Sequence, residues 1–195
     1  METVFKDLVM KGVPWPDGSP FVVAVNDRRA TEIRTALIQM MDNADKSIII
    51  EHAYFSDNKV IEAVRRAVQR GVMVKIILPR DPDTHGYANK ATINRLLDSG
   101  AETSPRIFLF PHMSHAKVVL TDGKIAALGS ANLTPRSMLT SREVTLLVHG
   151  SRDDPFLKKL RQRLHADIDK SEQVMAPFKL GFIHRVKGVV GKYVW

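Results

Sequence analysis

The sequence predicts an α/β domain in which a mixed, largely parallel sheet is flanked by helices on both faces. Short β-branched apolar runs alternate with amphipathic stretches of helical period through the first half of the 195 residues. This order of strand, helix, strand, helix and strand is typical of parallel strands joined by crossover helices. An Asp122-Gly123 pair then joins two further apolar runs as an antiparallel hairpin, which makes the sheet mixed.

The first regular elements follow an irregular stretch. Residues 1–19 hold several Gly and Pro without a clear period, and we expect a leader or linker there. The apolar run 20–26 predicts a strand. Residues 27–43 predict a helix, because their apolar side chains recur at helical spacing, and the β-branched run 47–51 suits a buried strand.

The alternation of helix and strand then continues. Residues 58–70 carry an apolar stripe and stop at Gly71, which is a common residue just past a helix end. A strand over 72–78 ends at a proline. A loop over 80–87 leads into a helix over 88–98, which stops before a glycine.

The second half is richer in strands. We expect strands at 106–110, 115–121, 124–128 and 143–148, with a long basic helix over roughly 154–170. The hairpin turn lies between the second and third of these strands.

One domain over 20–175 is therefore expected, followed by a basic amphipathic tail over 176–195. The tail mixes aromatic, aliphatic and cationic side chains, as helices that lie on a membrane surface do. Its internal glycines weaken a helix, so packing on the domain or dimerisation through the tail is the alternative.

The net charge of the chain indicates the class of partner that it would bind. The formal net charge is +8 and the isoelectric point is about 9.8, which favours an anionic partner such as nucleic acid, anionic phospholipid or an acidic membrane surface. A basic protein without a charged partner is the alternative.

The cellular compartment is indicated by features that the sequence lacks. Without cysteine there are no disulfides and no thiolate metal sites, which favours a reducing compartment. No apolar run is long enough to span a bilayer, and the N-terminus lacks the order of a signal peptide. We expect a cytoplasmic location, with peripheral membrane attachment as an option.

A cluster of polar side chains lies at one end of the predicted hairpin. His115 and Lys117 are two residues apart, so a strand would project both from one face. The returning strand brings Ser130 and Asn132 to the same end, and Gly129 permits a close backbone approach. Ammonium and carboxamide groups draw charge off phosphoryl oxygens, and a neutral imidazole is a competent nucleophile. This patch suits attack at phosphorus.

Such an imidazole also needs a carboxylate to orient it. Glu143 opens the next strand and is the better candidate. Asp122 is the weaker one, because it lies at the turn end of the hairpin, away from His115.

The stretch HAKVVLTDGKIAALGSAN (115–132) resembles the HKD signature of the phospholipase D superfamily, which is written HxKx4Dx6GSxN. All six defined positions of the signature match. AYFSDNKVIEAVRRAVQRGVMVKIILP (53–79) and ANLTPRSMLTSREV (131–144) resemble cardiolipin synthases, and the likeness covers roughly 20–170. The chain thus resembles a phospholipase D-like half, closest to the C-terminal half of cardiolipin synthase-like proteins.

The resemblance implies a reaction and a role for each residue. A histidine attacks phosphorus to form a phosphohistidine, and a second histidine protonates the leaving alcohol; His115 would take one of these two roles. No metal and no cofactor are implied, because lysines neutralise the charge. The implied residues are His115, Lys117 and Glu143 for catalysis, Lys117, Ser130 and Asn132 for binding the substrate phosphate, and Asp122 and Gly129 for the structure of the motif.

The sequence contains one His-x-Lys, which is half of such a site. Two arrangements would complete it: a homodimer that pairs His115 with its twin across a twofold axis, or a longer two-motif protein that supplies the other half. The AVNDRR stretch (24–29) resembles the start of the second half of cardiolipin synthases.

Three functions remain open. The first is a phosphodiesterase or phosphatidyltransferase that acts on glycerophospholipids by hydrolysis or by transfer to an alcohol. The second is a metal-independent nuclease of the same superfamily, which the positive charge fits equally well. The third is a non-catalytic half-domain that needs a partner half.

Overall fold

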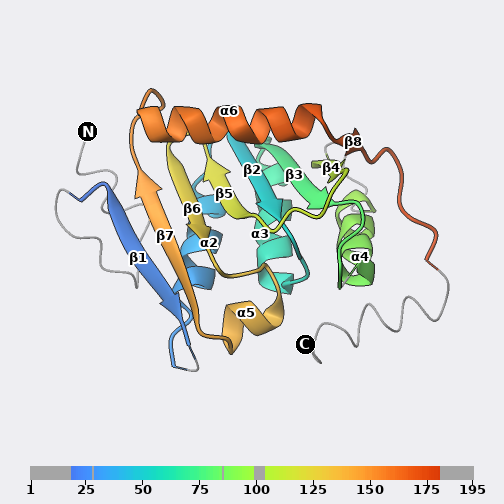
Figure 1. Cartoon of the computed structure of the whole chain (residues 1–195), viewed down its shortest axis with the longest axis horizontal. Helices are drawn as coiled ribbons and strands as arrows, with labels where there is room; N and C mark the ends of the chain where they lie inside the picture. The colour runs from blue at the N-terminus through green and yellow to red at the C-terminus, as the bar shows by residue number, and fades with distance from the viewer. Residues whose placement is uncertain (1–18, 28, 85, 99–103, 181–195) are drawn as a thin grey trace.

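A computed structural model describes residues 19–27, 29–84, 86–98 and 104–180 (Figure 1). The strands are β1 (Phe21–Asn26), β2 (Ser47–His52), β3 (Met73–Pro79), β4 (Arg106–Phe110), β5 (Lys117–Thr121), β6 (Ile125–Gly129), β7 (Glu143–His149) and β8 (Glu172–Gln173). The helices are α2 (Glu32–Asp42), α3 (Asn58–Gln69), α4 (Gly86–Leu97), α5 (Pro135–Leu139) and α6 (Pro155–Asp169). Residues 1–18 of the predicted leader and 181–195 of the predicted tail lie outside the described part.

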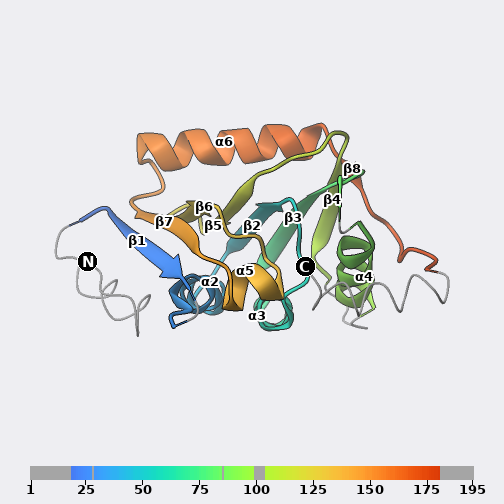
Figure 2. The same cartoon turned by 60° about the horizontal axis from the view of Figure 1, so that its bottom comes forward.

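All eight strands join one mixed sheet in the order β1-β7-β6-β5-β2-β3-β4-β8. Helices cover both faces: Figure 2 shows α6 on one side of the sheet and α2, α3, α4 and α5 on the other. The predicted α/β class, the mixed sheet and the two helical layers are confirmed.

The parallel part of the sheet is smaller than predicted. Of the seven strand pairings, two are parallel, β2 with β3 and β3 with β4. The alternation of strand and helix predicted parallel strands joined by crossover helices, which would make β1 and β2 parallel neighbours only if no other strand came between them. Instead the β5–β6 hairpin and β7 lie between them, so β1 pairs antiparallel with β7 at the sheet edge.

The first helix and the first strand of the hairpin begin later than predicted. The first helix begins at Glu32 rather than at 27, because the Asp27 carboxylate accepts the backbone N–H groups of Arg29 and Ala30 at 2.6 and 2.9 Å and forms a turn. The hairpin strand begins at Lys117 rather than at His115.

Two short elements were not predicted. Helix α5 starts with a Thr134 cap, whose hydroxyl accepts the Ser137 N–H, and with a proline in its first turn. Strand β8 has two residues and pairs with β4 at the far edge.

The core has one layer on each face of the sheet. The larger layer packs α2 and α3 on the sheet and contains Ile33, Ile50, Val64 and Ile76, among others. The smaller layer lies under α6 and includes Ile49, Phe108, Leu120 and Leu164. Burying each such apolar side chain contributes roughly 1.5–3 kcal/mol, so the two layers fix the strands whose ends carry the site.

Candidate active site

Apart from Asp122, the HKD residues lie at one end of the sheet, where β5 begins, β6 ends and β7 begins (Figure 1). Lys117 is the first residue of β5, Gly129 is the last of β6 and Glu143 is the first of β7. Antiparallel pairing of β5 with β6 and of β6 with β7 brings these three strand ends together. The predicted hairpin and the strand that follows it therefore bring Lys117 and Glu143 to a common end of the sheet.

Gly129 is required by the close approach of β7. A Cβ atom at this position would lie 2.2 Å from the Val144 carbonyl oxygen and 2.6 Å from the Thr145 Cα. Both atoms belong to backbone and cannot move aside, so any side chain would separate β6 from β7.

Ser130 is locked to β7 directly after this contact. Its backbone N–H donates to the Val144 carbonyl at 2.9 Å, and its hydroxyl accepts the Val144 N–H at 3.1 Å. The same hydroxyl donates to the Glu143 carboxylate. Ser130 thus positions Glu143, and within the described residues the Glu143 carboxylate is hydrogen-bonded to Ser130 rather than to His115.

Lys117 is a cation in a largely buried position, with 8% of its surface exposed. Its ammonium donates to the His115 carbonyl oxygen at 3.0 Å. Burial lowers the pKa of Lys117, and the negative charge of Glu143 opposes that shift. A partly desolvated ammonium next to a carboxylate is a strong donor for a phosphoryl oxygen.

His52 lies next to Lys117 on the neighbouring strand, since the two are paired residues of β2 and β5. Burial, and then the charge of Lys117, lower the pKa of His52 to about 3. The ring is therefore neutral at physiological pH and cannot serve as a proton donor there. Its Nδ1 is buried without a hydrogen-bond partner among the described residues.

His115 is exposed, and both of its neighbours are anchored to β2. Ser114 donates its hydroxyl to Glu51 at 2.7 Å, and the carbonyl of Ala116 accepts the Ala53 N–H at 3.1 Å. The period-2 argument for a common face does not apply to His115, because it precedes the strand. It is the anchored segment, together with the Lys117 bond to its carbonyl, that keeps His115 at the site.

Asn132 follows the hairpin in a segment that returns to the end of β2. Its neighbour Leu133 donates its N–H to the Tyr54 carbonyl at 3.1 Å and accepts the Ser56 N–H at 2.7 Å. The Asn132 side-chain oxygen is buried with no partner in the part of the chain that the structure describes.

Asp122 lies at the opposite end of the hairpin from Ser130 and Glu143. Its carboxylate accepts the backbone N–H groups of Asp45, Lys46 and Ser47 at 2.8–3.0 Å. Its own backbone has φ +54°, as the tight turn requires. Asp122 therefore ties the turn to the start of β2 and is too far along the hairpin to orient His115.

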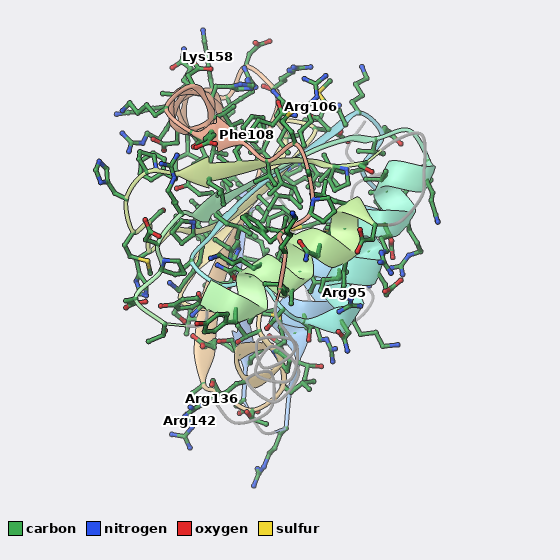
Figure 3. All side chains as sticks on the ribbon, turned by 90° about the vertical axis from the view of Figure 1, so that its right-hand side faces the viewer. Arg95, Arg106, Phe108, Arg136, Arg142 and Lys158 are labelled. Atoms are coloured by element: carbon green, nitrogen blue, oxygen red, sulfur yellow. The ribbon has the colours of Figure 1, made fainter. Side chains whose placement is uncertain are left out.

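Two exposed cationic side chains lie at this end of the molecule and are called its cationic rim below. Figure 3 shows Arg136 and Arg142 projecting from the end that carries α5, opposite the end where Lys158 projects from α6. A cationic rim favours the approach of an anionic substrate.

Tyr54, which follows β2, makes a contact with the loop between β3 and α4 that motif reasoning did not find. The Tyr54 hydroxyl donates to the Asp83 carboxylate, which belongs to the loop between β3 and α4. Asp83 lies in a Pro-Asp-Thr stretch with no chemical signature, and only the fold reveals what it faces.

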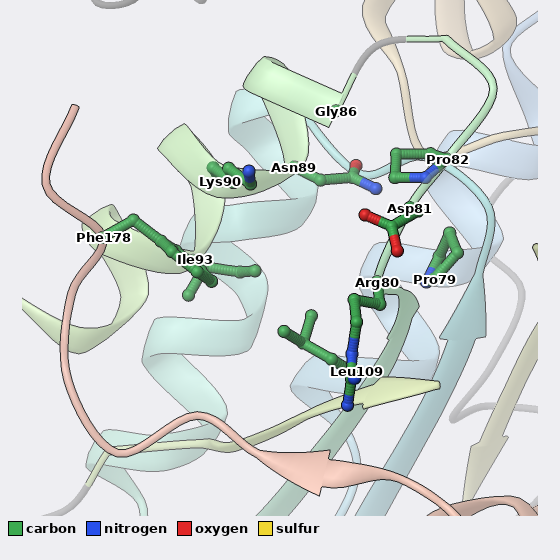
Figure 4. Close-up of a pocket in the computed structure, with 10 residues that line it drawn as sticks. All are labelled: Pro79, Arg80, Asp81, Pro82, Gly86, Asn89, Lys90, Ile93, Leu109 and Phe178. Atoms are coloured by element: carbon green, nitrogen blue, oxygen red, sulfur yellow. The ribbon is translucent and has the colours of Figure 1, made fainter. Parts of the chain in front are cut away.

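An open hollow is lined in part by the same loop (Figure 4). It is formed by the loop after β3, one face of α4 and Phe178. No residue of the HKD motif lines it, so the hollow is separate from the site.

Neither a metal-binding cluster nor a membrane-spanning helix occurs among the described residues. They contain no group of three or more His, Cys, Asp or Glu side chains that could hold a metal ion. None of their helices has both the length and the apolar character required to cross a bilayer.

Comparison with known sequences gives a consistent family. The family described as "Cardiolipin synthase, PLD-like domain" matches residues 37–168. A cardiolipin synthase of Oceanobacillus iheyensis is 33% identical over 162 residues, which are 80% of this chain and 32% of that protein. One of Listeria monocytogenes is 32% identical over 153 residues, 76% of this chain and 30% of that protein. The chain spans about a third of the length of these relatives.

Solved structures share the fold. A phospholipase D family member, Nuc from Salmonella typhimurium, has a TM-score of 0.69 and 20% identity, over 79% of this chain and 98% of that chain. The phosphatidylserine synthase of Haemophilus influenzae also has a TM-score of 0.69, with 15% identity, over 89% of this chain and 45% of that chain.

Proposed function

Because the chain belongs to the family of cardiolipin synthase, PLD-like domains, we propose that it cleaves or exchanges a phosphodiester through a phosphohistidine. The observation that carries the proposal is the arrangement at the sheet end. His115 is exposed, and its carbonyl oxygen accepts a hydrogen bond from the buried ammonium of Lys117. The negative charge of Glu143 interacts with that ammonium. This set supplies an imidazole for attack or proton transfer and a donor for the phosphoryl oxygens.

The proposed reaction has two displacements and needs two imidazoles. One ring attacks phosphorus, so an N–P bond forms while the P–O bond to the leaving alcohol breaks. The second ring gives its proton to that alcohol. Water or an acceptor alcohol then attacks phosphorus, loses its proton to the second ring and releases the first. His115 supplies one of these rings, while Lys117 and Asn132 hold the non-bridging oxygens.

The substrate class we propose is a glycerophospholipid. Relatives named cardiolipin synthase and a structural neighbour named phosphatidylserine synthase support this choice. The cationic rim at Arg136 and Arg142 fits the anionic headgroup of such a lipid (Figure 3). The net charge of +8 would also serve a nucleic acid, so charge alone does not decide between the two.

One assay separates the candidate functions. The full chain is incubated in EDTA with phosphatidylglycerol vesicles and, separately, with plasmid DNA. We expect release of glycerol, with either phosphatidate or cardiolipin as the lipid product, and intact plasmid. Nicked plasmid with unchanged lipid would replace the lipid proposal by a nuclease, and no product from either substrate would favour the non-catalytic half-domain.

We further propose that a second HKD half completes the site. When no other protein supplies it, a second copy of this chain does so by forming a homodimer. Its docking surface is an apolar patch on the α6 side of β1 and β7. Val23 pairs with Leu146 and Val25 with Val144 across these strands. The members of the patch are Phe21, Val23, Val25, Val144 and Leu146, which are 54%, 52%, 38%, 55% and 37% exposed.

This patch supports pairing for three reasons. Exposed apolar side chains that adjoin one another are uncommon on a monomer surface and mark interfaces. Helix α6 crosses one end of this face of the sheet and leaves these strands uncovered (Figure 1). The patch also reaches the site, because Val144 follows Glu143 directly and is bonded to Ser130.

A further inference from the structure

Glu51 is an ionisable residue that is buried on the α6 side of the sheet, close to the site but outside the HKD motif. Its side chain points to the same face as that of Ile49, which belongs to the core layer under α6 (Figure 2). It is 6% exposed, and its partner in the β2–β5 register is Val118, the second residue of β5. Glu51 therefore lies near the segment that leads into β5.

The carboxylate of Glu51 is costly to bury and is bonded to the residue before His115. Among the described residues, its hydrogen bond comes from the Ser114 hydroxyl, which donates to Oε1 at 2.7 Å. Burial raises the pKa of Glu51, and the hydrogen bond from Ser114 opposes this shift. Asp167 on α6 is also buried, but it is paired with Arg163 at 2.8 Å. The Ser114 hydroxyl thus compensates a carboxylate that would otherwise be expensive to keep in the interior.

Ser114 also closes a short turn around His115. Its hydroxyl oxygen accepts the Ala116 N–H at 3.4 Å, so one side chain connects the residue before His115 with the residue after it. The Ala116 carbonyl in turn accepts the Ala53 N–H at 3.1 Å. The backbone of His115 is therefore held on both sides, although residues 113–116 have no regular secondary structure.

A second contact reaches His115 from the other face of the sheet. Successive residues of a strand point to opposite faces, so His52 and its partner Lys117 face away from Glu51. The Lys117 ammonium donates to the His115 carbonyl oxygen at 3.0 Å. The segment that carries the imidazole is thus held by a cation on one face of the sheet and by a carboxylate on the other.

We propose that Glu51 is a positioning residue for His115 and that it acts through Ser114. Glu51 touches no reacting atom; it fixes the place from which the imidazole reaches phosphorus, while Glu143 serves Lys117 and Ser130. The consequence for turnover rests on the proposed function, whereas the link from Glu51 to the backbone around His115 does not.

The test begins with Ser114→Ala, which removes the link at a half-buried position. In the assay with phosphatidylglycerol vesicles, kcat should fall by about 10-fold or more, because a small misplacement of a reacting group slows the reaction. KM should stay within about twofold, since the contacts that bind the substrate remain. S114T restores the hydroxyl and E51Q keeps an oxygen that accepts it, so both should retain kcat within about threefold of wild type.

Ser171→Ala is the matched control. This serine is also half-buried, and its hydroxyl donates to the Asp167 carbonyl at 2.6 Å, just past the end of α6. S171A should match wild type in kcat and KM. Backbone order parameters from ¹⁵N relaxation give a second readout that needs no turnover: the value for His115 should fall from about 0.85 towards 0.6 in S114A and stay unchanged in S171A.

The double variant E51A/S114A tests whether the two residues act as one link, with circular dichroism to confirm folding. One link predicts a kcat equal to that of the slower single variant, whereas a loss equal to the product of the two single losses would overturn the proposal. It would also be overturned by an S114A chain that matches S171A in both kcat and the His115 order parameter. If the wild-type chain has no phosphodiesterase activity, the function proposed above fails, and the order parameters alone then decide the role of Glu51.

Discussion

Replacing His115 by Asn lowers the rate of phosphodiester turnover by about 10⁴-fold or more, the loss expected when a group that makes or breaks bonds is removed. The amide has nearly the shape of the imidazole but can neither attack phosphorus nor shuttle a proton. His115 is exposed, and its neighbours Ser114 and Ala116 are held through their own contacts with β2. The fold of H115N should therefore match that of the wild type.

The measurement is product release from phosphatidylglycerol vesicles in EDTA, with circular dichroism to confirm folding. His112→Asn provides the control, because this exposed histidine lies three residues earlier on the same segment. H112N should retain the wild-type rate within about twofold. Turnover by H115N within tenfold of wild type would show that the reaction does not pass through this ring.

Replacing Val23 by Asp should abolish the same activity at low protein concentration, through loss of pairing rather than loss of chemistry. Val23 lies in the apolar patch, on the edge strand, and its side chain points away from the main core. Burying a carboxylate in an apolar interface without a partner costs several kcal/mol, so the dissociation constant of the dimer should rise by about 100-fold or more.

Sedimentation equilibrium measures the pairing, and vesicle assays over a range of protein concentrations measure its consequence. Met175→Asp is the control: this methionine is 82% exposed and lies outside the patch. V23D should be a monomer whose activity returns as concentration increases, while M175D should behave as wild type. A fully active V23D monomer would mean that one chain contains a complete site.

The strongest sequence predictions were those in which a local pattern determines local geometry. The Asp122-Gly123 pair indicated the hairpin, and the structure has β5 and β6 in antiparallel register on either side of it. The apolar stripe of 58–70 indicated α3, which buries that stripe on the sheet. In both segments the local pattern allows only one conformation that buries the apolar side chains.

Predictions failed where distant segments decide the outcome. The position of β1 at the far edge depends on which strands come between it and β2, and no short pattern encodes this. Asp83 is likewise unremarkable in sequence. It gains its neighbour only because β3 lies beside β2, whose end carries Tyr54.

The structure explains physically why the motif has a glycine at position 129. The sequence suggested a close approach at this glycine, and the structure identifies its partner as the β7 backbone at Val144 and Thr145. The predicted roles of Lys117, Ser130 and Asn132 at a substrate phosphate stay predictions. What the structure adds is that their polar groups share one end of the sheet with His115 and Glu143.

The stereochemical course at phosphorus decides whether His115 works in a covalent, two-step exchange. A phosphatidylglycerol analogue that is chiral at phosphorus, with one non-bridging oxygen replaced by sulfur, is converted by the full chain and the product configuration is read by ³¹P NMR. Two in-line displacements, each with inversion, predict overall retention. Inversion would mean that water or alcohol attacks the substrate directly, and the phosphohistidine account would be wrong.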